Sequence, residues 1–150
     1  MVQETKAQTF SLKNMLGIFN DNDQPLIEIE VKGASGISKK ILAIVDSGFN
    51  GYLQLPYIEA FPIGLILAGI QSGLVADGSQ SSYFVCKGQV CVDGKCIDTT
   101  IDIKPTNIVL LGTKLLKELG KIFILDCANR KVEITDGQTK PKVISSGAKG

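Results

Sequence analysis

The chain of 150 residues contains no histidine and no tryptophan. The absence of histidine excludes a Ser-His-Asp triad, a Cys-His pair and a His-ligated metal site within this chain. Because only 6% of the residues are aromatic, a platform that stacks nucleic-acid bases is not expected either. Any catalysis must therefore rest on Asp, Glu, Lys, Cys, Ser or Tyr.

Blocks of one charge and long apolar runs are also missing. The net charge is +1 without a Lys/Arg block, which argues against nucleic acid and membrane as partners. No apolar run reaches the roughly 18 residues of a membrane helix, and the polar start of the chain lacks a signal core, so we expect a cytoplasmic protein. We expect an arm over residues 1–14, one domain over residues 15–136 and a flexible tail over residues 137–150.

Cysteine is present four times, but no C-x-x-C pair occurs, so a zinc knuckle is improbable and we predict no metal and no cofactor. Cys91 and Cys96 bracket Asp93-Gly94, a two-residue hairpin turn signal. They would face each other with Cα atoms about 4.5 Å apart, the short limit for a disulfide. We expect both to be free thiols that can be oxidised.

Five apolar residues, 41–45, run directly into Asp46. Such a run predicts a strand buried on both faces, and burying an ionised carboxylate without partners is costly. One interpretation is a turn, since Asp, Ser, Gly and Asn are common turn residues. The other is a catalytic carboxylate. The local pattern alone favours the turn.

The remaining patterns predict a mostly β protein. Strands are expected at 15–19, 26–31, 39–45, 65–76, 81–92 with an interruption at Gly88, 96–103, 122–125 and 131–135. A helical turn is expected at 57–61 and one clear helix at 113–119. Glu28, Glu30, Asp98 and Asp102 should lie on the solvent-facing sides of their strands. The fold class is all-β, a small closed barrel or sandwich with one short helix in the C-terminal half.

Three features follow one another in a characteristic order: the strand ending in Asp46-Ser47-Gly48, a hairpin tip at Asp77-Gly78-Ser79, and Leu110-Leu111-Gly112 opening a Leu-rich helix. In this order, residues 26–135 resemble the retropepsin-type aspartic proteases, which include retroviral proteases and bacterial and archaeal relatives. The resemblance implies an acid-protease fold. It also implies a catalytic role for Asp46, active-site support from Ser47 and Gly48, and substrate contacts from a flap and a pocket wall at Asp77, Gly78, Ser79, Ile108 and Leu110.

An aspartic protease needs two carboxylates about 3 Å apart that share one proton. This chain has one Asp-Ser-Gly, so a two-fold homodimer must supply the second. We therefore predict a homodimeric aspartic endopeptidase acting on peptides or unfolded proteins. Two departures from the retroviral pattern are Phe49-Asn50-Gly51 and, in place of an Arg, Thr113-Lys114. The alternative is an inactive module that binds peptides or dimerises.

Overall fold

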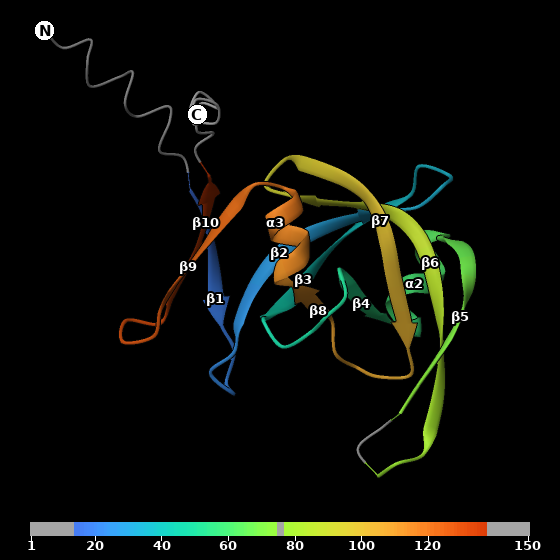
Figure 1. Cartoon of the computed structure of the whole chain (residues 1–150). Coiled ribbons are helices and arrows are strands. Elements are labelled where there is room, and N and C mark those ends of the chain that lie inside the picture. Colours follow the sequence, from blue (N-terminus) through green and yellow to red (C-terminus); the bar gives the residue numbers. More distant parts are fainter. Residues whose placement is uncertain (1–13, 75–76, 138–150) are drawn as a thin grey trace, which may run out of the picture.

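The computed structural model describes residues 14–74 and 77–137, in which ten strands form one continuous sheet (Figure 1). The strands are β1 Met15–Phe19, β2 Pro25–Lys32, β3 Ser38–Asp46, β4 Leu53–Pro56, β5 Ile66–Leu74, β6 Gln80–Val92, β7 Lys95–Lys104, β8 Leu110–Gly112, β9 Lys121–Asp126 and β10 Lys131–Asp136. The helices are α2 Tyr57–Ala60, the 3-10 helix η1 Phe61–Ile63 and α3 Thr113–Glu118. None of the described helices is long and apolar enough to cross a membrane.

Six of the strands close into a barrel. The sheet order is β5-β6-β7-β4-β8-β3-β2-β1-β10-β9, and an additional pairing of β6 with β2 joins the two ends of the central six. Alternate side chains on each strand face the barrel interior: Ile27, Ile29 and Val31 of β2 are buried, whereas Glu28 between them is exposed. The expected all-β closed barrel is confirmed.

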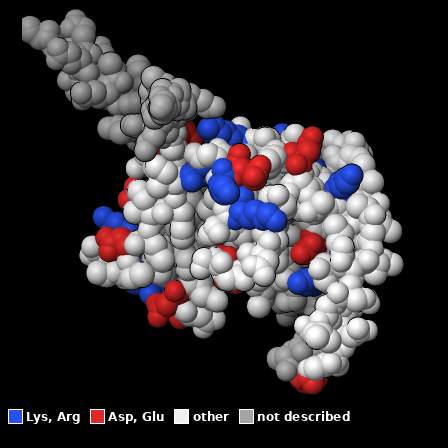
Figure 2. All heavy atoms as spheres, viewed as in Figure 1, with Lys and Arg blue, Asp and Glu red and all other residues white. Residues whose placement is uncertain are grey.

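Two parts of the sheet extend beyond the barrel (Figure 1). On one side, the hairpin of β5 and β6 projects away from it, and Asp77 at its tip is the one charged residue between Ile66 and Cys86. Figure 2 shows this projecting hairpin as a nearly uncharged surface, whereas both positive and negative side chains lie on the surface of the barrel. On the other side, β1, β10 and β9 form a separate antiparallel extension.

Most predicted elements are present with bounds shifted by one or two residues, and α3 is confirmed, with Leu115 and Leu116 buried and Gly120 at φ 66° after its end. The predicted interruption at Gly88 is wrong, because β6 runs through it. A Cβ on Gly88 would lie 2.5 Å from Leu65 Cδ2, so glycine serves close packing there. The predicted arm and tail lie outside the described residues, apart from Asn14 and Gly137.

The expectation of free thiols at Cys91 and Cys96 is also wrong, because the two residues form a disulfide. Asp93 and Gly94 both have positive φ, 50° and 83°, the conformation of a type I′ hairpin turn. This turn places Cys91 directly opposite Cys96 with their Cα atoms 3.9 Å apart. The predicted facing of the two cysteines is therefore confirmed, and the disulfide between them was not predicted.

Candidate active site

Asp46 is the last residue of β3 and lies where the barrel strand meets a turn. β8 pairs parallel with β3 and antiparallel with β4, so it lies between them and sets Gly112 beside Asp46. Val45, one residue earlier, is buried in the core, whereas Asp46 is half-buried and Ser47 and Gly48 are exposed. The chain therefore passes from core to surface at Asp46.

The turn after β3 holds the Asp46 carboxylate by one oxygen. The Gly48 N–H donates to Asp46 Oδ1 at 2.8 Å, and the Phe49 N–H donates to the Asp46 carbonyl at 3.2 Å. A Cβ on Gly48 would lie 3.3 Å from Asp46 Oδ1, so a larger residue would crowd the carboxylate. Within residues 14–74 and 77–137, no other side-chain hydrogen bond or ion pair involves the Asp46 carboxylate.

Gly112 permits the close packing that fixes the far side of this turn. Its N–H donates to the Tyr52 carbonyl at 3.0 Å. A Cβ at this position would lie 2.0 Å from the Gly51 carbonyl oxygen, far inside van der Waals contact. Only glycine can be accommodated at this separation. The structure therefore places Gly112, at the end of Leu110-Leu111-Gly112, against the Asp46 turn.

Ile108, one of the two predicted pocket residues, lines a surface hollow of about 550 Å³ beside β3. Ile44, two residues before Asp46 and hence on the same face of β3, lines this hollow as well. The Gln54 side chain donates to the Ile108 carbonyl at 3.3 Å and fixes the wall. Leu110 is half-buried and does not line the hollow.

The predicted flap residues form the tip of the β5–β6 hairpin, well away from the Asp46 turn in Figure 1. Both the N–H and the hydroxyl of Ser79 donate to Asp77 Oδ1, at 2.9 and 2.6 Å, and these hydrogen bonds lower the pKa of Asp77. Gly78 has φ 88°, a conformation that glycine adopts readily. The structure thus builds a tight tip but does not bring it to Asp46.

Asp102 also belongs to this region. It lies on the face of β7 opposite the buried Ile101 and Ile103, as its strand pattern predicted, but it is half-buried and not fully exposed. The parallel pairing of β4 with β7 sets Gln54 beside Asp102 and brings the preceding loop over it. Asp102 Oδ2 lies 3.2 Å from the position that a Cβ on Gly51 would take. Burial raises the pKa of Asp102, and the nearby Lys104 partly opposes the rise. The alternation of apolar and polar residues could not predict the partial burial of Asp102, because it does not show which loop covers that face of the strand.

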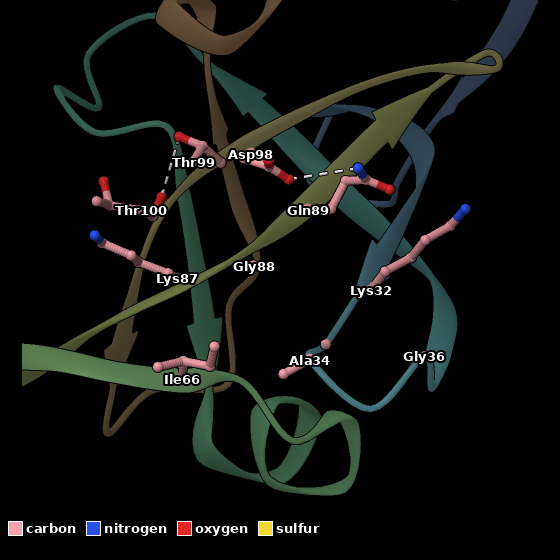
Figure 3. A pocket seen from close by; sticks show the side chains of 11 residues that line it. Lys32, Ala34, Gly36, Ile66, Lys87, Gly88, Gln89, Asp98, Thr99 and Thr100 are labelled. Atoms are coloured by element: carbon pink, nitrogen blue, oxygen red, sulfur yellow. Dashed lines mark hydrogen bonds between the residues drawn. The ribbon is translucent and has the colours of Figure 1, made fainter.

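A second hollow, of about 650 Å³, lies between the Gly33–Gly36 turn and the base of the β5–β6 hairpin (Figure 3). Lys32 and Lys87 extend from its rim, and Gln89 donates to Asp98 at 3.4 Å across its wall. It includes none of the predicted site residues. Within the described residues, no group of three or more His, Cys, Asp or Glu could hold a metal ion.

Comparison with known proteins relates this barrel to retroviral proteases. No protein-family model matches the chain, and no curated protein matches it. Among solved structures, the protease of EIAV, in complex with the inhibitor HBY-793, matches with TM-score 0.52 and 15% identity over 71% of this chain and 98% of that one. The simian foamy virus protease matches with TM-score 0.45 and 20% identity over 63% and 93%. The fold is therefore retropepsin-like.

Proposed function

We propose that the protein is an aspartic endopeptidase that works as a homodimer, with Asp46 of each copy giving one carboxylate of the catalytic pair. The position of Asp46 carries the proposal. It ends a barrel strand, is held through Oδ1 by the Gly48 N–H and lies beside Gly112. The retropepsin-like fold supports the proposal, although a fold alone does not fix an activity.

The chemistry needs a second carboxylate close to the first. Two such groups about 3 Å apart share one proton, so one acts as base on a water while the other donates to the scissile carbonyl. In a two-fold dimer the symmetry mate of Asp46 supplies that group. Ser47 and Gly48 are exposed, so the surface of the turn is open to a second copy.

The β1–β10–β9 extension offers a surface on which a second copy can pack. Leu16 lies opposite Glu133, which lies opposite Ile124, so Leu16 and Ile124 share one face of this sheet, and both are exposed. β9 is the last strand of the sheet order and has one unpaired edge. Exposed edges of this kind pair readily with another chain. A dimer formed here would bury exposed aliphatic side chains.

The substrate class follows from the surfaces near Asp46. In the hollow beside β3, Ile44 and Ile108 offer apolar contacts to a side chain of an extended peptide. Lys39, Lys40 and Glu59 line the same hollow and offer charged contacts. The β5–β6 hairpin, in which Asp77 is the one charged residue between Ile66 and Cys86, exposes Ile70 and Leu74 and provides an apolar cover that closes over the peptide. We therefore expect unfolded protein segments with apolar residues near the cleaved bond to be the substrates.

A second candidate function is a peptide-binding module without activity, and one observation favours it. The ammonium of Lys114, at the position after Gly112-Thr113, lies 4.6 Å from the centre of the Tyr52 ring rather than against an acid near Asp46. An ion pair that would stiffen the site is thus replaced by a weaker cation–π contact. A looser site would bind peptides without cleaving them.

The test measures cleavage of casein between about pH 4 and 7, together with the sedimentation of the protein. Asp46→Asn should lower the rate by roughly 10³-fold or more, whereas Asp21→Asn, which alters an exposed turn acid, should leave the rate unchanged. Unchanged cleavage by the Asp46 variant, or cleavage by a species that stays monomeric, would refute the proposal. A dimer that binds casein but leaves it intact would support the second candidate.

A further inference from the structure

A group of polar and aromatic side chains lies between the loop after Asp46 and the base of the β5–β6 hairpin. The Lys104 ammonium lies 4.6 Å from the centre of the Tyr83 ring and 6.0 Å from that of the Phe49 ring. Phe49 belongs to the loop and Tyr83 to β6. Lys104 thus bridges the two parts, and Asp102, two residues earlier on β7, shares its face of the strand.

The Asp102 carboxylate accepts no hydrogen bond from this group, although the charge of Lys104 lies close enough to act on its pKa. None of the ion pairs or side-chain hydrogen bonds within residues 14–74 and 77–137 involves it. It is nevertheless half-buried, and the rise in its pKa has desolvation as its first cause. Neither Asp102 oxygen is among the buried atoms that lack a partner in the described part of the chain, so solvent reaches them. A donor that arrives with a ligand can replace that water.

The loop after Asp46 packs against Asp102 and ties the group to Asp46. Residues 47–51 carry no charge. The Phe49 ring and Asp102 Oδ2 fill the space beside Gly51, at 2.6 and 3.2 Å from the position that a Cβ there would take. The Gly51 carbonyl packs on Gly112, which pairs with Asp46. Asp102 is therefore linked to Asp46 through Gly51 and Gly112.

We propose that Asp102, together with Phe49 and Tyr83, forms a subsite that selects a basic residue, Arg or Lys, at one position of the peptide substrate. A guanidinium or ammonium donates directly to a carboxylate and stacks on aromatic rings. In the free protein the Lys104 ammonium lies near the Tyr83 and Phe49 rings. It is displaced toward solvent when a substrate cation enters. The subsite rests on the proposed peptidase function and adds its specificity.

The experiment compares peptides that differ at one position. A series of fluorogenic peptides carries Arg, Gln or Glu at each position around the cleaved bond in turn, and kcat/KM is measured for each. The wild type should favour Arg over Glu at a single position by roughly tenfold or more. Asp102→Asn should reduce that ratio to near one, whereas Asp98→Asn, which removes the same charge four residues earlier on the same strand face, should preserve it.

Three outcomes decide the matter. A preference that Asp102→Asn abolishes and Asp98→Asn retains supports the subsite, and a preference for Glu, or one that Asp102→Asn leaves intact, overturns it. If the wild type cleaves no peptide, the peptidase proposal fails by itself. Binding of the same Arg and Glu peptides is then measured by fluorescence anisotropy, and a Kd ratio that is insensitive to Asp102→Asn overturns the subsite independently.

Discussion

Replacing Gly112 by alanine is the sharpest perturbation of the candidate site that leaves every charge in place. The added Cβ would lie 2.0 Å from the Gly51 carbonyl oxygen, a backbone atom that cannot rotate away. The strand and the loop must separate by roughly 1 Å. This movement also stretches the hydrogen bond from the Gly112 N–H to the Tyr52 carbonyl. Overpacking and a weakened buried hydrogen bond together predict a loss of about 2–4 kcal/mol in the free energy of unfolding.

Activity should fall as well, because Gly112 pairs with Asp46 and a 1 Å displacement of a reacting group can cost roughly 100-fold. The assay combines urea unfolding, followed by circular dichroism, with peptide hydrolysis. Gly73→Ala is the matched control, since a Cβ there meets nothing within 4 Å, and its stability should stay within about 0.5 kcal/mol of wild type. If Gly112→Ala unfolded at the wild-type urea concentration, close packing of Gly112 on the Gly51 carbonyl would not stabilise the fold, whether or not the protein is a peptidase.

Two further predictions concern Lys121, whose side chain is 1% exposed and lies 2.7 Å from Asp136 and 3.7 Å from Asp93. Asp136→Asn should lower the free energy of unfolding in urea by about 1–2 kcal/mol, because it leaves a buried ammonium with only a distant acid. Lys121→Met should lower it by less than about 1 kcal/mol, because both acids remain partly hydrated. A larger loss in Lys121→Met than in Asp136→Asn would contradict this reasoning. The hydrogen bond from Lys121 lowers the pKa of Asp136, so its stabilisation is present above the ordinary value of about 3.9 and is lost as pH falls through the lowered pKa. The cost of Asp136→Asn should therefore shrink between about pH 5 and pH 2, and a cost independent of pH would show that the ion pair contributes nothing.

Local patterns predicted the elements of this protein well where one strand face or one helix stripe is buried. The alternation in residues 26–31 reflects a strand with Ile27, Ile29 and Val31 in the core, and it required no knowledge of the neighbouring strands. The leucines of α3 and the glycine after it likewise predicted that helix from local pattern alone. The sequence patterns did not predict β4, a four-residue strand buried at every position, because it has no alternation to detect.

The sequence by itself determined the barrel class, the helix and the chain position at which a carboxylate leaves the core, because burial of apolar side chains imposes its period on the residues. Only the tertiary structure decided which segments meet at that carboxylate. The parallel pairing of β4 with β7 brings Asp102 under the loop after Asp46, and the parallel pairing of β3 with β8 sets Gly112 against Gly51. These contacts join residues some fifty to sixty positions apart, and no local periodicity encodes the partner of a strand.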